Sequence, residues 1–518
     1  APRSASPLTG ASSGSSFVVA ETSYGKVLGQ ANGPINEFKG VPYGAPTGGR
    51  NRFMPPGKPT PWVGVRECLA FGPINPQTLP DLRSDYAMMI MWDRHVGGMG
   101  EDQLHLNIWT PGLRDGAKRP VFVSFHGGGF ETGSGNAPGF DGAQLARFGD
   151  AVVVTVNHRL SSFGYIDLVS LGAPNDFAYA GVAGVMDMVA SLEWVRDNIE
   201  AFGGDPSRVM IFGQSGGGAK TSVLLGCPAA KGLFSRAAVQ SGSLLKLVDR
   251  ETAAKSTVAL LDKLGIPRSR PADLQKVPWT AMLEAQAAVA SAAPGGRFAP
   301  VLDGHYLPHH PFDPAAPEES ADVPLIVSTA LEDAALSLIN FDLDEPGLKQ
   351  VLAHRFGGQA DEITALYRAR YPNKAAFLVQ AQAFTDAGFR RAAIAQAELK
   401  ARQGRGKVWM YQWDWATPAF DSKFGAVHGI DVSASFHNYR DQTVGSGVAA
   451  GRRMCKRLAS AWVAFAHTGD PNNSEIPAWP TYDPQRRATM LFNDEMRAED
   501  DPRGELRRYW AGHPPVAA

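Results

Sequence analysis

A serine flanked by glycines is the group in this chain best placed by its neighbours to do covalent chemistry. The segment 213–217, Gly-Gln-Ser-Gly-Gly, matches the pattern G-x-S-x-G, in which a serine hydroxyl attacks a carbonyl carbon. The pattern alone is weak in a chain with 56 glycines, and residues 10–14 match it too. Ser215 differs because apolar residues 209–212 precede it and a predicted helix, 216–225, follows it. We predict that Ser215 is a nucleophile; a glycine turn with an idle serine is the alternative.

A second glycine-rich run could stabilise the negative charge that such an attack creates. His126-Gly127-Gly128-Gly129-Phe130 follows an apolar segment, and its glycines leave backbone N–H groups free to face a developing oxyanion. A phosphate-binding loop is the alternative, but the Gly-Lys-Ser/Thr that such a loop requires does not follow. Residues 133–135, Gly-Ser-Gly, also lack the spacing of a dinucleotide fingerprint. The run therefore predicts an oxyanion hole.

Short apolar runs predict the elements that must position these groups. Residues 121–125, 151–156 and 209–212 are bounded by Gly, Pro, Asp or Asn, as is typical of strands buried on both faces of a parallel sheet. Between the last two, apolar residues recur with a helical period from Val185 to Ile199. Strand, helix and strand in this order predict an α/β fold with a large, mostly parallel central sheet flanked by helices. Residues 408–413 resemble a further strand.

Composition and charge limit the partners and the domain organisation. The chain has 518 residues with 50 Lys and Arg against 51 Asp and Glu, so no net field draws it to nucleic acid or to an anionic membrane. Apolar stretches are far shorter than the roughly 18 residues of a membrane helix. Residues 1–16 are serine-rich and poor in apolar side chains, which predicts a flexible tail before a single domain at 17–518. The oligomeric state is left open.

Cysteine usage and the start of the chain bear on redox state and location. Cys68, Cys227 and Cys455 are too few for a disulfide framework and lack zinc-site spacing. The chain opens Ala-Pro without Met, as a processed N-terminus would, which predicts export to the periplasm or beyond the cell. An artificially trimmed N-terminus is the alternative. His309 and His310 lack the spacing of metal ligands, so we expect neither a metal nor a cofactor.

Several further motifs, in order, make the chain resemble the type-B carboxylesterase family, to which cholinesterases belong, within the α/β-hydrolase fold. The resemblance covers nearly the whole length. It implies a serine esterase with a catalytic triad. The motifs are those at residues 38–44 (FKGVPYG), 101–107 (EDQLHLN), 157–160 (NHRL) and 201–206 (AFGGDP).

The resemblance assigns the remaining site residues position by position. It implies that the backbone amides of Gly128, Gly129 and Gly216 form the oxyanion hole. Residues 324–333 resemble the strand that leads to the family's catalytic acid, which falls on Asp333.

The neighbour of that acid, Glu332, is the alternative. The loop Gly425-Ala426-Val427-His428-Gly429 resembles the family's histidine loop, which makes His428 the base. The chain order serine, acid, histidine is the one that this fold requires.

Three positions depart from the family pattern. Asn75 and Gln103 stand where the family usually has a pair of cysteines, which predicts that this bridge is absent. Gln214 replaces the acid that commonly precedes the nucleophile and removes a negative charge that would favour a cationic substrate, so choline esters are not expected. Residues 181–184 lack the usual Asn, with no consequence that we can name.

The predicted activity is hydrolysis of carboxylic esters through an acyl-enzyme. The chain also resembles bacterial fumonisin esterases within the family, which implies release of tricarballylic acid from a mycotoxin. Lys220 and Lys246 are the candidates to bind such a polyanionic acyl group, and a solvated surface lysine is the alternative for each. A general esterase for small neutral or xenobiotic esters, cleavage of amides or carbamates, and a silent binding module are the other possibilities.

Overall fold

The computed structural model describes residues 16–91, 96–292 and 298–513. The predicted tail, apart from Ser16, lies outside these residues. Within them, the strands form a 13-stranded sheet in the order β1-β2-β3-β5-β7-β6-β8-β9-β10-β11-β12-β13, with β4 paired to β2. The strands are β1 (Phe17–Thr22), β2 (Gly25–Asn32), β3 (Ile35–Pro42), β4 (Val65–Glu67), β5 (His105–Thr110), β6 (Arg119–Phe125), β7 (Val152–Val156), β8 (Gly204–Gln214), β9 (Arg236–Gln240), β10 (Leu325–Ala330), β11 (Val408–Trp413), β12 (Ala488–Phe492) and β13 (Arg497–Asp500).

The centre of the sheet is parallel and its two edges are antiparallel. Every neighbouring pair from β7 to β12 is parallel, whereas β1, β2, β3 and β5 form an antiparallel edge and β13 closes the other. The predicted strand segments 121–125, 151–156 and 209–212 are confirmed in β6, β7 and β8. All residues of β6 and β7 are buried, as the continuous apolar runs predicted.

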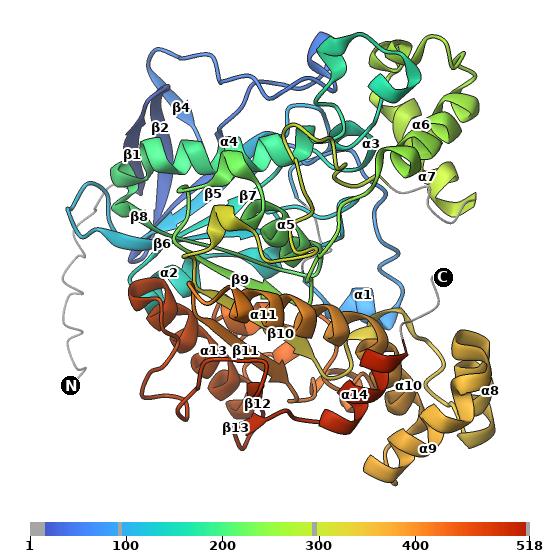
Figure 1. Ribbon diagram of the computed structural model, residues 1–518. Coiled ribbons are helices and arrows are strands. Elements are labelled where there is room, and N and C mark those ends of the chain that lie inside the picture. Colours follow the sequence, from blue (N-terminus) through green and yellow to red (C-terminus); the bar gives the residue numbers. More distant parts are fainter. Residues whose placement is uncertain (1–15, 92–95, 293–297, 514–518) are drawn as a thin grey trace, which may run out of the picture.

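Helices cover both faces of this sheet (Figure 1). The α-helices are α1 (Asp85–Met89), α2 (Ala143–Gly149), α3 (Ser161–Gly164), α4 (Ala183–Asn198), α5 (Gly216–Leu225), α6 (Arg250–Leu264), α7 (Trp279–Ala292), α8 (Glu345–Phe356), α9 (Ala360–Arg370), α10 (Ala376–Thr385), α11 (Arg391–Gln403), α12 (Ile430–Ser435), α13 (Ala449–Thr468) and α14 (Gly504–Gly512). A π-helical turn, Asp386–Arg390, joins α10 to α11. The predicted helices at 185–199 and 216–225 are therefore confirmed in α4 and α5, with Ile199 just beyond the end of α4.

Alternate strand residues fill two separate cores. Val121 and Val123 of β6 point to the core that α4, α5 and α11 cover, whereas Phe122 between them points to the core under α2, α12 and α13. A third, smaller cluster lies among α8, α9, α10 and α14, away from the central strands. Because the central strands are parallel, their carboxyl ends share one edge, and the predicted site residues follow those ends.

Candidate active site

Ser215 lies at a sharp turn between the end of β8 and the start of α5. Its φ of 60° and ψ of −125° are strained values for a residue with a side chain. The backbone is close-packed here, since a Cβ added to Gly217 would lie 2.0 Å from the carbonyl oxygen of Phe125. The Ser215 amide donates a 2.8 Å hydrogen bond to the carbonyl of Gln240 at the end of β9. The turn has the strand–turn–helix geometry that a nucleophile elbow requires, so Ser215 stays the predicted nucleophile.

The glycine loop after β6 packs directly against this elbow. Gly128 and Gly129 have φ angles of 85° and 61°, which favour glycine. A Cβ on Gly216 would lie 2.3 Å from the amide nitrogen of Gly129, and one on Gly127 would lie 3.4 Å from the Cβ of Ser215. The structure thus brings the three residues predicted to supply oxyanion donors together beside the serine.

The predicted base and acid are joined by a hydrogen bond of 2.6 Å between His428 Nδ1 and Asp333 Oδ1. Asp333 is fully buried, and its second carboxylate oxygen accepts bonds of 2.9 Å from the Ser241 hydroxyl and from the Ala330 amide. An ionised carboxylate can only accept, so Nδ1 carries the proton and Nε2 is left as the basic nitrogen. This is the tautomer that can take a proton from a serine.

Glu332, the alternative acid, is occupied elsewhere. Its Oε1 accepts hydrogen bonds from Lys374 Nζ at 2.6 Å and from Gln382 Nε2 at 2.7 Å, and its Oε2 accepts from the Ala426 amide at 2.8 Å. Residue 332 also forms a β-bridge with Val427. Glu332 therefore anchors the histidine loop, while its neighbour holds the imidazole.

The two halves of the site meet at the segment 240–242 that follows β9. Gln240 accepts from the Ser215 amide, the Ser241 hydroxyl donates to Asp333, and a Cβ on Gly242 would lie 2.0 Å from the Ser215 carbonyl oxygen. Among the described residues, no hydrogen bond joins the Ser215 hydroxyl to the His428 ring. Catalytic hydrogen bonds of this kind often form only once substrate is bound, so this contact stays a prediction.

Three residues that contact the predicted acid or base, Ser241, Tyr86 and Phe389, were not predicted from the sequence. Besides Ser241, the Tyr86 hydroxyl donates to the His428 carbonyl at 3.0 Å, and the Phe389 ring lies 5.0 Å from the His428 ring, centroid to centroid. Ser241 could have been found, because Ser-Gly directly follows the apolar strand β9. Tyr86 and Phe389 come from a one-turn helix and a π-helical turn, for which the sequence carries no pattern.

The two lysines proposed for an anionic acyl group have different surroundings. Lys246 is 65% exposed and lies 3.5 Å from Asp313, so it is the solvated lysine of the alternative. Lys220 is fully buried, and its Nζ donates to the backbone carbonyl of His126 at 2.8 Å. Neither prediction for Lys220 was right: it lies in the core behind the glycine loop, out of contact with solvent.

Asn75 and Gln103, which stand where the family usually has a pair of cysteines, contact each other in the structure. Gln103 Nε2 donates to Asn75 Oδ1 at 3.1 Å, and both side chains are buried. Thr47 adds a bond to Gln103 Oε1. An amide pair thus closes the loop that a disulfide would close. The chain's three cysteines are free and buried at other places.

Two further observations concern possible metal ligands and the length of the helices. No group of three or more His, Cys, Asp or Glu that could hold a metal occurs in the described part of the chain. His309, one of the two adjacent histidines, instead lies 2.9 Å from Glu319 Oε1. None of the helices within the described ranges is both long and apolar enough to cross a membrane.

The fold, the elbow and the buried acid–histidine pair define an α/β-hydrolase, and comparison with known proteins identifies which kind. The model of the carboxylesterase family matches residues 16–510, so the chain belongs to that family and is a carboxylic-ester hydrolase. It is 32% identical over 500 residues to the para-nitrobenzyl esterase of Bacillus subtilis, covering 95% of this chain and 98% of the relative.

Two further similarities extend this result. The fumonisin B1 esterase of Sphingopyxis macrogoltabida is 29% identical over 497 residues, covering 92% of this chain and 87% of that protein. A carboxylesterase of Geobacillus stearothermophilus, solved at pH 6.2, superposes with a TM-score of 0.81 at 35% identity, covering 95% of this chain and 99% of the other. The resemblance predicted from the motifs is therefore confirmed at the level of the family and the fold.

Proposed function

We propose that the protein hydrolyses esters through a covalent acyl-enzyme on Ser215. His428 takes the hydroxyl proton as Oγ attacks the carbonyl carbon, Asp333 holds the imidazole, and the amides of the glycine loop and the elbow stabilise the oxyanion. Water then attacks the acyl group with His428 again as the base. The 2.6 Å contact between Asp333 and His428, beside a strained serine turn, is the observation that carries the proposal.

Variants of three residues test this mechanism. Ser215→Ala should lower kcat about 10⁶-fold, and Asp333→Asn about 10⁴-fold, which are the effects typical of such triads. Glu332→Gln is the comparison, because it changes the adjacent carboxyl, which anchors the histidine loop without contacting the imidazole, and it should lower kcat far less than Asp333→Asn does. Hydrolysis of p-nitrophenyl acetate measures the rates, and circular dichroism checks the fold. Residual activity of Ser215→Ala within tenfold of the wild type would remove Ser215 from the mechanism.

Small neutral esters are the substrate class that the surroundings of the site support best. Gln214, next to the nucleophile, is neutral, Lys220 is buried and Lys246 is paired with Asp313. The similarity to a para-nitrobenzyl esterase points to the same class. We therefore propose neutral alkyl or aryl esters as the preferred substrates.

Tricarballylic esters of the fumonisin type are the second candidate. The 29% identity to a fumonisin B1 esterase supports them. One partly exposed cation lies near the histidine loop: Lys423 packs 4.1 Å from the Phe341 ring centre and pairs with Asp85. An anionic acyl group would have to compete with Asp85 for this charge.

A panel of esters separates the two classes. We expect kcat/KM for p-nitrophenyl butyrate to exceed that for a tricarballylic ester by at least tenfold, because no unpaired cation faces the site among the residues named above. A preference for the tricarboxylate that is lost in Lys423→Met would favour the second candidate.

Export is also a proposal, and fractionation of the source cells would test it.

A further inference from the structure

A buried lysine lies directly behind the glycine loop. Lys220 is on α5, five residues after Ser215, and its side chain is completely shielded from solvent. Its Nζ donates to the His126 carbonyl at 2.8 Å and lies 5.9 Å from the centre of the Phe130 ring. His126 and Phe130, the first and last residues of the glycine run, therefore both lie near the Lys220 amine.

This burial is costly, which indicates that the amine does something that an apolar side chain could not. No carboxylate in the described ranges pairs with Lys220, and burial holds the pKa of its amine well below that of an exposed lysine. The adjacent His158 ring, stacked 4.9 Å from His126, also has a lowered pKa, because of its own burial and the nearby Lys220. Methionine would fill the same space on α5 without this cost.

The lysine contact adds an anchor from outside to a loop whose own hydrogen bonds, such as the one of 2.8 Å between His126 Nδ1 and the Gly127 carbonyl, are local. Gly127, Gly128 and Gly129 have no side chains that could hold their backbone in place. The glycines at the start of helix α5 pack against the loop, with Gly216 lying against Gly129, and Lys220 adds a side-chain hydrogen bond to the peptide carbonyl at the start of the loop. Oxyanion donors must be held to within about 0.5 Å to be effective.

We propose that Lys220 is a positioning residue that holds the glycine loop in the conformation needed for oxyanion stabilisation. It acts through the His126 carbonyl and touches neither substrate nor reacting atoms. In the step concerned, Ser215 Oγ bonds to the ester carbon, its proton passes to His428, and the carbonyl electron pair moves to the oxygen that the loop amides bind. The inference rests on the proposed function, since it assumes this role for the loop.

Lys220→Met tests the inference by removing the N–H donor at nearly constant volume. We expect kcat to fall about 10- to 100-fold with KM within about twofold, because the oxyanion contact is made in the transition state. Lys400→Met is the matched control: Lys400 is also buried and donates to two backbone carbonyls, those of Ser320 and Ala321, but it lies on α11. Lys400→Met should keep the wild-type kcat.

Binding of an aryl trifluoromethyl ketone distinguishes positioning from general damage. The ketone forms a hemiketal with Ser215 whose oxyanion needs the loop amides, so its affinity should fall by the same factor as kcat/KM in Lys220→Met and stay unchanged in Lys400→Met. Rates are expressed per active site titrated with a fluorophosphonate. Lys220→Gln, which keeps a donor on a shorter side chain, should lie between the wild type and Lys220→Met, and it carries the comparison if the methionine variant does not fold.

Two results would overturn separate claims. Wild-type kcat and ketone affinity in Lys220→Met would refute the positioning role and leave the acyl-enzyme mechanism intact. An active Ser215→Ala variant, together with a wild type that the ketone does not inhibit, would refute the proposed function itself.

Discussion

At the scale of single residues, the site and its surroundings combine one strained turn at Ser215 with two buried carboxyl groups, those of Asp333 and Asp431. Asp333 is fully buried, but three hydrogen bonds satisfy its oxygens. Asp431, also fully buried, accepts one from the Tyr411 hydroxyl at 2.7 Å, while its other oxygen accepts no hydrogen bond from the residues that the structure describes. Burial and the nearby charge of Asp333 raise the pKa of Asp431 to about 6. Two buried carboxyls on neighbouring elements thus have different environments.

Asp431 should make stability depend on pH. Its pKa is about 6 in the folded chain and about 4 in an unfolded one, so the folded state binds more protons between these values. The stabilisation is complete below about pH 4 and lost as the pH rises through about 6, a change of about 3 kcal/mol. The Asp431→Asn variant cannot titrate at this position, so it lacks this pH-dependent contribution to the free energy of unfolding. Its Tm relative to wild type should therefore rise from pH 4.5 to pH 7.5; a constant difference would contradict the assignment.

The residue scale also shows what the sequence could not specify. The motifs placed Ser215, the glycine loop and the pair of Asp333 and His428 near one sheet edge, because each follows a strand or a family-like segment. Lys220 was misplaced because a lysine on a helix is usually solvated. Only the packing of α5 under the glycine loop reveals its burial, and no local pattern encodes that packing.

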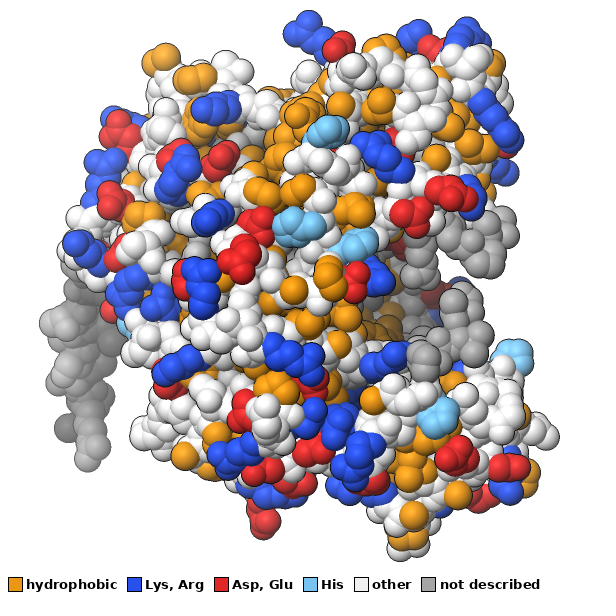
Figure 2. All heavy atoms as spheres, in the orientation of Figure 1, with side chains coloured by type: hydrophobic (Ala, Val, Ile, Leu, Met, Phe, Trp, Pro, Cys, Tyr) orange, Lys and Arg blue, Asp and Glu red, His pale blue; other side chains and the backbone are white. Residues whose placement is uncertain are grey.

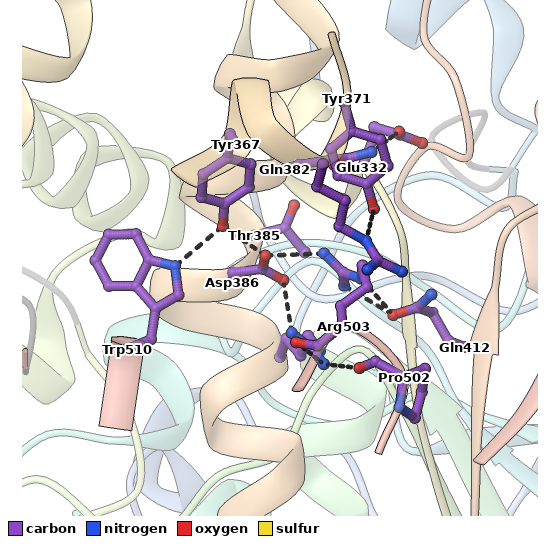
Figure 3. Close-up of polar contacts among 12 residues, drawn as sticks. Glu332, Tyr367, Tyr371, Gln382, Thr385, Asp386, Gln412, Pro502, Arg503 and Trp510 are labelled. Atoms are coloured by element: carbon purple, nitrogen blue, oxygen red, sulfur yellow. Dashed lines mark hydrogen bonds and ion pairs between the residues drawn. The ribbon is translucent and has the colours of Figure 1, made fainter. Parts of the chain in front are cut away.

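At the scale of elements, a buried polar network docks the last helix, α14, onto α9 and α10. The Arg503 guanidinium donates to Asp386 Oδ2 at 2.8 Å and to Gln412 Oε1 at 2.7 Å (Figure 3). The Tyr367 hydroxyl donates to the same Asp386 oxygen and accepts from Trp510 Nε1. Asp386 begins the π-helical turn that ends just after Phe389, whose ring contacts His428.

Arg503→Met should destabilise this docking strongly. It removes the closest cation from a buried carboxylate and leaves Arg390, at 3.6 Å, and the neutral Tyr367 hydroxyl to face it, a change that typically costs about 3–5 kcal/mol. The measurement is Tm by differential scanning calorimetry. Arg508→Ala on the same helix is the control, because Arg508 is 65% exposed and its loss should cost under about 1 kcal/mol. Equal Tm values for the two variants would argue against the network.

Element prediction from sequence succeeded where burial leaves a continuous apolar run. The segments of β6, β7, β8 and β11 were found for that reason. The antiparallel edge formed by β1, β2 and β3 was not predicted, because in these strands buried residues are interrupted by half-buried ones and, in β1 and β2, by exposed ones. The network around Asp386 joins positions more than 100 residues apart and has no local signature.

At the scale of the whole molecule, the net charge is close to zero and the three thiols are shielded from solvent. The net charge is −1, and acidic and basic side chains are interspersed over the face seen in Figure 2. The thiols are all buried, and burial raises the pKa of Cys68 to about 12 and that of Cys227 to about 11, and also raises that of Cys455. A buried thiol with a raised pKa forms little thiolate at neutral pH.

The native enzyme should therefore resist thiol reagents. With Ellman's reagent at pH 8, we expect no cysteine to react within minutes in buffer and three to react in 6 M guanidinium, about one equivalent per cysteine. Activity should be unchanged by the reagent. Rapid release of one equivalent from the folded protein would show that at least one of these sites opens.

The amide pair between Asn75 and Gln103 has a consequence for recombinant expression of the protein. Since this closure is a hydrogen bond and the three cysteines are free, there is no disulfide that an oxidase or a disulfide isomerase would have to form. Expression in a host compartment rich in glutathione should yield the same specific activity as expression in an oxidising one.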